Sequence, residues 1–229
     1  MKVNDIKEVE GHILVKTDRT FAVFRFTTEF TLACLYNHND ASCDNIVAIT
    51  IASKHAGGEV VESLTMQVLL THNILEQWEL EKNGNKLVNN PDKMVRYYCK
   101  DEECLLYSGD ILPAMKLVAA GTVFRSVLIW QTETGKVAHR LLGHTGVIFD
   151  VIFLSQNSVT ELEHVQVASV SDDRSLRVYK GEEQICELYG HKARIWKVRE
   201  LVGESESTDN QRILATTSED ATCRIWYVS

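Results

Sequence analysis

The chain has 229 residues, a formal net charge of −8 at pH 7, and a composition that is 45% hydrophobic and 8% aromatic. These values are ordinary for a globular protein that is long enough to bury a full core. Affinity for a nucleic-acid backbone is built from lysine and arginine, so the acidic balance argues against a protein that binds nucleic acid on its own.

Signals for membranes, secretion and metals are also missing from the sequence. There is no run of eighteen or more apolar residues, and the first eight residues mix acidic and basic side chains where a signal peptide needs a continuous apolar stretch. Six cysteines occur without a Cys-x-x-Cys pair and without a histidine at zinc-finger spacing. We therefore expect a cytoplasmic protein with no membrane insertion, no metal and no other cofactor.

Short apolar segments rich in β-branched and aromatic residues begin near the N-terminus and predict strands. In the first group, Asp18 stands six residues before the aromatic residue Phe24, the same interval that separates an Asp from an aromatic residue in the two later copies described below. No strand is predicted before residue 12. In the second group, a polar stretch at residues 81–93 is predicted to be a loop before the last strand. The predicted strands are residues 12–16, 21–24 and 30–36, followed by 46–52, 63–70, 74–78 and 94–98.

A third group predicts four strands at residues 104–107, 116–122, 127–130 and 137–142. After it, one pattern is written twice. His144 and His191 each follow a glycine and stand 47 residues apart, and so do the aromatic residues that close the two copies, Tyr179 and Trp226. A period of this length indicates a repeat array.

The closing aromatic residues set the fold prediction. Five of them stand 54, 52, 49 and 47 residues apart along the chain: Phe24, Trp78, Trp130, Tyr179 and Trp226. This spacing predicts an all-β β-propeller with about five blades, in which each blade is a small antiparallel meander. We expect one partial propeller over residues 1–229, an incomplete ring from a larger protein, with blades at about 1–36, 46–98, 104–142, 147–189 and 195–229.

A Gly-His start, an Asp in a tight turn and an aromatic residue six positions later together resemble a WD-repeat blade. The resemblance implies a buried hydrogen-bond relay, in which the Asp receives one histidine proton and the histidine passes another toward a hydroxyl. Its members are His144, Ser169 and Asp173 in the first copy, and His191, Thr216, Asp220 and Trp226 in the second. A His/Asp/Ser hydrolase is the alternative, but a pattern that occurs once per repeat is typical of a scaffold, and no Gly-x-Ser-x-Gly motif is present.

Candidate contact residues for a partner follow the two histidines. Phe149 and Trp196 both lie five positions after their histidine, and Lys192 and Arg194 precede Trp196. Seven basic residues against three acidic ones lie between Arg174 and Arg199. Exposed aromatic and arginine side chains often anchor interfaces. The alternatives are that the aromatic side chains pack between blades and that the charges only keep strand edges soluble.

Some residues are more particular than the general blade pattern. The stretches Val118–Val123 with Val127–Trp130, Gly143–Phe149, Ser171–Tyr179 and Gly190–Val198 together resemble the amino-terminal propeller of the WD-repeat-containing protein six family. Members of that family are non-catalytic partners of the methyltransferase that places a 2′-O-methyl group on the wobble nucleotide, position 34, of certain tRNAs. They are several times longer than this chain, so the resemblance implies an amino-terminal portion.

The resemblance implies a scaffold rather than an enzyme. The catalytic subunit of the tRNA 2′-O-methyltransferase would be the protein partner, and tRNA would be reached indirectly or within that complex, with no small-molecule substrate. The sequence agrees, because it has no Gly-rich loop that could bind a methyl donor. A WD-repeat adaptor in signalling or endosomal trafficking is the second hypothesis, and an enzyme acting alone is a distant third.

Overall fold

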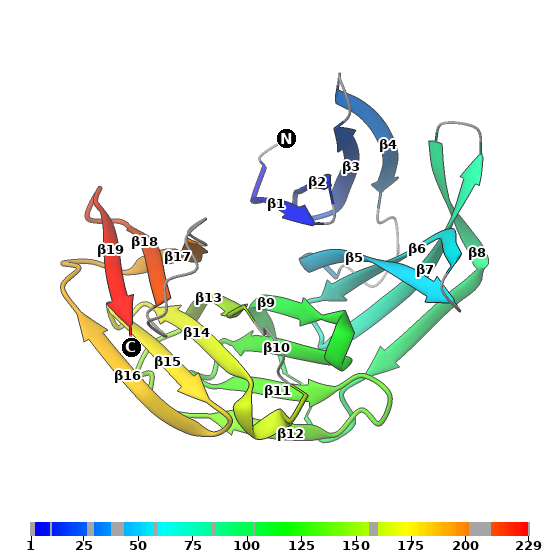
Figure 1. The fold of residues 1–229 in the computed structure, drawn as a ribbon. Helices are drawn as coiled ribbons and strands as arrows, with labels where there is room; N and C mark the ends of the chain where they lie inside the picture. The colour runs from blue at the N-terminus through cyan, green and yellow to red at the C-terminus, as the bar shows by residue number, and fades with distance from the viewer. Residues whose placement is uncertain are drawn as a thin grey trace. The chain divides into compact units, whose positions relative to one another are not determined.

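The computed structural model describes residues 3–9, 11–26, 30–37, 44–56, 59–83, 86–102, 104–155, 160–201 and 212–228. The chain divides into two compact units, residues 1–99 and 100–229. The described residues form β-strands apart from turns and two short 3-10 helices, η1 (Pro113–Met115) and η2 (Leu162–His164). The strands make five antiparallel sheets, each a meander in chain order (Figure 1). In the described part of the chain, no helix is long and apolar enough to span a membrane.

The first sheet consists of β1 (Asp5–Val9), β2 (His12–Lys16), β3 (Thr20–Phe26) and β4 (Phe30–Asn37). The absence of a strand before residue 12 was predicted and is wrong, because β1 pairs with β2 from Asp5↔Lys16 to Val9↔His12. None of the β1 side chains is buried. An edge strand that faces solvent needs no apolar run, so its sequence carried no hydrophobic signal.

The second sheet consists of β5 (Ile46–Ala56), β6 (Glu59–Leu70), β7 (Ile74–Asn83) and β8 (Lys86–Tyr98). Residues 81–93 were predicted to be a loop, but β7 and β8 extend through most of this stretch as a hairpin. Charged pairs across the strands hold it, since Lys93 Nζ lies 3.5 Å from Glu79 and 3.4 Å from Glu81. Pro91 falls where the register shifts between Trp78 and Leu80, and a bulge tolerates a residue that has no N–H.

The second unit contains three sheets. The third sheet of the chain is β9 (Leu106–Leu112), β10 (Leu117–Thr122), β11 (Val127–Gln131) and β12 (Val137–Leu141). The fourth is β13 (Ile148–Phe153), β14 (Gln166–Ser171), β15 (Ser175–Lys180) and β16 (Glu183–Tyr189). The fifth is β17 (Ile195–Leu201), β18 (Arg212–Ser218) and β19 (Cys223–Val228). This all-β arrangement of propeller blades confirms the fold class expected from the spacing of the closing aromatic residues.

The core of the second unit lies between successive sheets. Every residue of β10 is buried, as is every residue of β11 except Gln131. A strand covered on both faces must be apolar on both faces, which explains why these segments read as continuous hydrophobic runs. One buried cluster joins the third and fourth sheets around Ile129, Ile148 and Tyr179, and another joins the fourth and fifth around Val178, Ile195 and Leu214.

One edge of these three sheets carries the turns and the strand starts described below. In each antiparallel meander, the start of the first strand and the turn between the second and third strands lie at the same end. This places residues 105–107, 122–126, 142–149, 171–175, 189–196 and 218–222 together, and we call them the turn edge. Each of the three turns has a residue of positive φ at the equivalent place, Arg125 (72°), Arg174 (68°) and Ala221 (63°), so the turns share one backbone geometry.

Candidate functional site

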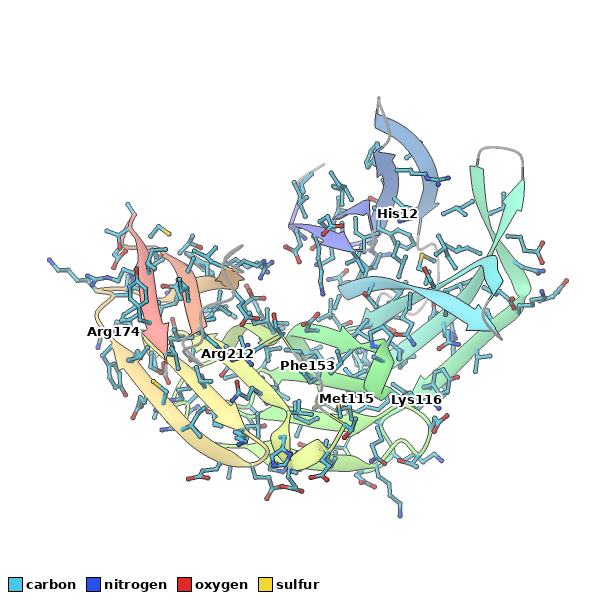
Figure 2. The ribbon with its side chains drawn as sticks, viewed as in Figure 1. His12, Met115, Lys116, Phe153, Arg174 and Arg212 are labelled. Carbon is cyan, nitrogen blue, oxygen red and sulfur yellow. The ribbon has the colours of Figure 1, made fainter. Side chains whose placement is uncertain are left out.

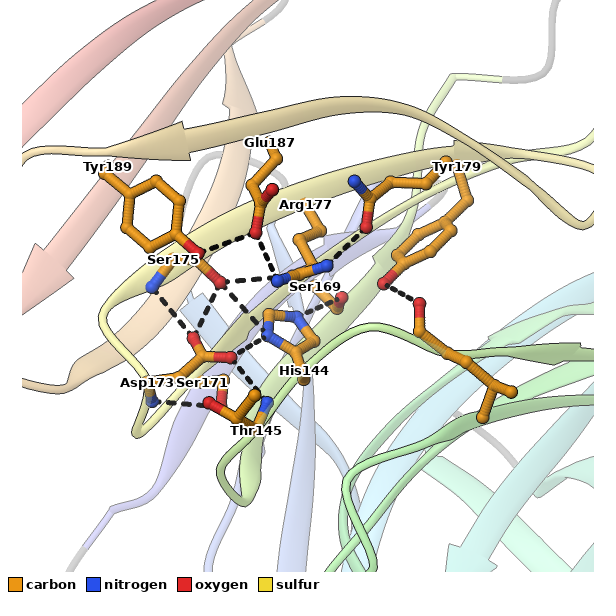
Figure 3. Close-up of polar contacts among 12 residues, drawn as sticks. His144, Thr145, Ser169, Ser171, Asp173, Ser175, Arg177, Tyr179, Glu187 and Tyr189 are labelled. Carbon is orange, nitrogen blue, oxygen red and sulfur yellow. Dashed lines mark hydrogen bonds and ion pairs between the residues drawn. The ribbon is translucent and has the colours of Figure 1, made fainter.

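The first relay lies at the turn edge of the fourth sheet (Figure 3). His144 Nδ1 lies 2.8 Å from Asp173 Oδ2, and Nε2 lies 2.9 Å from the Ser169 hydroxyl. The side chains of His144 and Asp173 are only 1% and 7% exposed. The structure thus brings together the three residues that the sequence assigned to the first relay.

Further donors surround Asp173. The backbone N–H of Thr145 donates to Oδ2 at 2.9 Å, and Ser175 donates to Oδ1 from its backbone N–H at 2.9 Å and from its hydroxyl at 2.6 Å. Burial would raise the pKa of Asp173, but the hydrogen bonds from His144 and Ser175 outweigh it and hold this pKa well below the usual range. The carboxylate therefore stays ionised and acts only as an acceptor.

The second relay repeats this geometry in the fifth sheet. His191 lies 2.9 Å from Asp220 Oδ2 and 2.8 Å from the Thr216 hydroxyl, and the backbone N–H of Lys192 donates to Asp220 at 2.8 Å. The Thr222 hydroxyl donates to Asp220 at 2.6 Å. That hydrogen bond, together with those from Lys192 and His191, outweighs burial and lowers the pKa of Asp220.

Tryptophan also enters the second relay. Trp226 Nε1 lies 2.8 Å from the Thr216 hydroxyl and can only donate to it. The Thr216 oxygen thus accepts from Trp226 and also makes a hydrogen bond of 2.8 Å with His191 Nε2. The tryptophan that closes this repeat is therefore a member of its relay.

The tyrosine that closes the first repeat binds a different partner. The Tyr179 hydroxyl donates to the backbone carbonyl of Leu142 at 3.1 Å, and burial raises the pKa of Tyr179 to about 12. On the other side, Arg177 Nε donates to the Ser175 hydroxyl at 3.3 Å and forms an ion pair with Glu187 on β16. The first relay is therefore tied to a further strand of its sheet.

Both relays are built for structure rather than for reaction. The Ser169 and Thr216 hydroxyls belong to residues that are 0% exposed, and each is held by the histidine above it. A nucleophile must reach its substrate, and neither hydroxyl has a path to solvent. The relays fix the turns and the loops that start each repeat, since Asp173 and Asp220 bind both segments at once.

The third sheet has no relay. In the third sheet Trp130 pairs with Val118, as Trp226 pairs with Leu214 in the fifth. Ala120 lies two residues after Val118, so it occupies the position that Thr216 has in the fifth sheet and Ser169 has in the fourth. As a result, the buried Nε1 of Trp130 has no hydrogen-bond partner among the described residues. Phe124 takes the position of the relay Asp in the turn, and it is 69% exposed.

Three aromatic side chains form a row across the sheets. Tyr107, Phe149 and Trp196 each occupy the extra position of a β-bulge at the start of the first strand of their sheet. Each of these residues is left unpaired with the neighbouring strand, and the bulge changes the direction in which its side chain points. Tyr107 and Phe149 pack edge to face with ring centroids 4.9 Å apart, and those of Phe149 and Trp196 are 4.7 Å apart. We call these three residues the bulge row.

Arg194 covers one end of the bulge row. Its guanidinium carbon lies 5.5 Å from the ring centroid of Trp196 and 5.9 Å from that of Phe149. Its Nε also forms ion pairs with Asp172 at 3.3 Å and Glu219 at 3.0 Å. Arg194 is therefore neutralised in place, whereas Lys192 is exposed.

The four residues predicted to contact a partner thus differ in their surroundings. Phe149 is only 8% exposed, so it supports the row from beneath and is not the exposed anchor that the sequence suggested. Trp196 is partly buried and Tyr107 is 52% exposed. Tyr107 was missed because its blade lacks the Gly-His start from which the other two positions were counted.

Sequence reasoning also missed a buried carboxylate between two blades. Asp150 on β13 is 4% exposed and accepts hydrogen bonds from Lys197 Nζ at 3.2 Å, the backbone N–H of Val198 at 3.1 Å and Arg199 Nη1 at 2.8 Å, all on β17. Asp110 on β9 accepts from the backbone N–H of Phe153 at 2.9 Å in the same way; Phe153 is labelled in Figure 2. These carboxylates bind one sheet to the next. Lys197 and Arg199, two of the basic residues counted in the sequence, therefore bind a buried carboxylate of the neighbouring sheet.

Comparison with known proteins matches two consecutive segments of the second unit to a repeat family. Residues 135–180 and 182–227 match the family model described as "WD domain, G-beta repeat", WD40. These two segments are WD40 repeats. Each match ends one residue after the closing aromatic of its repeat, and each contains one complete relay.

Curated relatives match about half of the chain. It is 28% identical over 139 residues to the human "tRNA (34-2'-O)-methyltransferase regulator WDR6" and 31% identical over 139 residues to the mouse protein of that name. Each match covers 54% of this chain and only 11% of the relative. It is also 32% identical over 120 residues to "Nuclear distribution protein nudF" of Aspergillus niger, which covers 51% of this chain and 25% of that protein.

A solved structure supports the fold alone. The WD40 β-propeller domain of Doa1 aligns with a TM-score of 0.53 at 11% sequence identity, covering 94% of this chain and 61% of that one. At this identity the likeness extends to the arrangement of strands and not to any function.

Proposed function

We propose that the chain is part of a non-catalytic WD-repeat scaffold that partners the methyltransferase acting on the wobble nucleotide, position 34, of tRNA. The observation that carries this proposal is the similarity to WDR6 proteins, which are named as regulators of that enzyme. The chain spans about a tenth of their length, so its contribution is one region of a larger scaffold.

The geometry of the two WD40 repeats supports a scaffold. Their histidines, carboxylates and hydroxyls are occupied in holding the turns, and the hydroxyls are buried. The turn edge, in contrast, presents aromatic and basic side chains that protein interfaces favour. The partner enzyme would carry the methyl donor and the chemistry, while this chain would supply contacts.

In this proposal, tRNA is reached within the complex rather than by this chain alone. A net charge of −8 opposes independent binding to a polyanion. The complex would work in the cytoplasm and would need no small-molecule substrate on this chain.

A second candidate is an adaptor that joins other proteins in signalling or endosomal trafficking, and the match to a nuclear distribution protein supports an adaptor role other than tRNA modification. Both candidates use the same blades and differ in the partner. The relatives therefore support a scaffold in either case, and the identity of the partner separates them.

The test is co-purification with the full-length natural protein, tagged at one end, combined with mass spectrometry of 2′-O-methylation at position 34 of tRNA in cells that lack the gene. We expect the tagged protein to bring down the catalytic subunit and the deleted cells to lose the modification. Normal methylation in the deleted cells, with trafficking or signalling proteins in the purified complex, would replace the first candidate with the second.

A further inference from the structure

The turn edge of the second unit combines an aromatic centre with free positive charges. Tyr107 and Trp196 of the bulge row reach solvent, and Phe124 stands exposed in the turn of the same edge where the other two sheets bury the relay Asp. A soluble protein gains nothing in folding from an exposed phenylalanine at a turn tip. Exposed apolar side chains that gather on one edge mark an interaction surface.

Three cations at this edge have no ion pair. Arg125 and Arg174 project from equivalent left-handed positions of two neighbouring turns, and Lys192 follows the relay histidine of the next repeat. All three side chains are exposed and make no salt bridge within the described part of the chain (Figure 2 labels Arg174). Arg194 differs, because Asp172 and Glu219 already neutralise it.

We propose that this edge binds an extended, acidic protein segment that places an apolar or aromatic side chain on Tyr107 and Trp196 and carboxylates on Arg125, Arg174 and Lys192. This inference rests on the proposed scaffold function and specifies the chemistry of the partner. Aromatic anchors surrounded by complementary charge are the common composition of a binding centre between proteins.

The arrangement favours a protein segment over single-stranded RNA. The rings of the bulge row already contact one another, so they leave no slot between them for a stacked base, and Arg194 covers one side of Phe149 and Trp196. Asp172 and Glu219 lie exposed beside that centre and would repel a continuous phosphate backbone. An acidic peptide avoids this repulsion, because it carries charge only at the positions that meet free cations.

The experiment begins with a photo-crosslinker in the full-length protein inside its own cells, introduced as Tyr107→p-benzoylphenylalanine. Mass spectrometry then identifies the captured segment. We expect a protein segment that contains several Asp or Glu residues together with an apolar or aromatic one. Crosslinks to RNA, crosslinks to a segment without carboxylates, or no crosslink above that of Tyr227→p-benzoylphenylalanine would overturn the proposal.

A synthetic peptide of the captured segment then tests each part of the surface by fluorescence anisotropy with the full-length protein. The double variant Tyr107→Ala, Trp196→Ala and the double variant Arg125→Glu, Arg174→Glu should each weaken binding by about tenfold or more. Matched controls lie at the opposite end of the same strands: Tyr227→Ala on β19 and Lys180→Glu on β15, both exposed residues, should leave binding unchanged. Equal losses in the controls, or none in the test variants at an unchanged melting temperature, would show that the edge is not the contact.

The outcomes for the two proposals remain distinct. If the acidic segment belongs to a protein other than the methyltransferase, the surface stands and the proposed function fails. If the double variants still recover the methyltransferase and normal methylation at position 34, the function stands and this surface fails.

Discussion

The two WD40 repeats hold the same relay but finish it differently. In the second repeat, Trp226 donates to Thr216, so tryptophan is part of the buried relay. In the first repeat, the Tyr179 hydroxyl donates to the Leu142 carbonyl instead, and Ser175 links the relay to Arg177, which pairs with Glu187 on β16. The histidine and Asp are therefore common to both turns, while the closing aromatic and the residues beside the turn bind different segments.

The third sheet shows what happens when the relay is removed. Its turn keeps the same backbone, with a positive φ at Arg125 and a hydrogen bond from Phe124 N–H to the Thr122 hydroxyl at 3.2 Å. An exposed phenylalanine occupies its Asp position, and its tryptophan N–H has no hydrogen-bond partner among the described residues. Turn geometry and relay are therefore separable, and the blade without a relay presents a different surface.

The largest effect should come from His144→Ala, which removes the ring that joins Asp173 to Ser169. A buried carboxylate loses a donor and a buried hydroxyl loses its partner, so we expect a loss of about 2–3 kcal/mol in the free energy of unfolding. His191→Ala should cost less, because its relay is not tied to a fourth strand in the described part of the sheet, whereas the first relay reaches β16 through Ser175 and Arg177. Chemical denaturation of both variants measures the order, and a larger loss for His191→Ala would contradict the comparison.

Acid should break the first relay through Asp173. The folded-state pKa of this group lies below its unfolded value of about 3.9, so its ionisation stabilises the fold above that pH and the contribution is lost as pH falls below it. We expect Asp173→Asn to be less stable than the natural chain near neutral pH and to lose less stability between about pH 5 and pH 2. Unfolding curves across that range test it, and parallel pH profiles for the two chains would show that Asp173 is not the titrating group.

Next in size is Thr216→Val, which keeps the shape of the side chain and removes the hydroxyl of the second relay. Trp226 Nε1 and His191 Nε2 then lose their shared partner, at an expected cost of about 1–2 kcal/mol. Thr217→Val, an exposed position on the same strand, is the control and should change stability little. If both variants melt alike, the tryptophan is not part of the relay.

Periodicity predicted the blades well where strands are buried and poorly where they are not. Segments such as β10 and β11 are covered on both faces, and their hydrophobic runs gave strands within one residue of the observed ones. None of the β1 side chains is buried, and Lys93 and Glu81 in the β7–β8 hairpin are exposed and paired with each other, so neither stretch carries an apolar period.

The site was predictable in part for a related reason. His144, Asp173 and their partners recur at a fixed interval, which a single sequence can show. Phe149 and Trp196 share that interval, but Tyr107 has no motif around it, and a bulge depends on which residue the neighbouring strand skips. Asp150 was missed since its partners Lys197 and Arg199 looked like part of a basic surface until the packing of β13 against β17 joined them.

The smallest expected effect comes from adding the buried hydroxyl that the third sheet lacks. Ala120 occupies the hydroxyl position of that sheet, and the Trp130 N–H above it is buried without a partner among the described residues. In Ala120→Ser the new oxygen can accept from Trp130 Nε1 as Thr216 accepts from Trp226, which should stabilise the chain by about 1 kcal/mol. Ala119→Ser is the matched control, since Ala119 is equally buried on the adjacent position of the strand and its side chain points to the other face. A hydroxyl there has no tryptophan N–H to meet and should destabilise. If Ala120→Ser destabilises as much as Ala119→Ser, the space beside Ala120 is too small for the oxygen, and a missing hydroxyl does not account for the unpaired tryptophan.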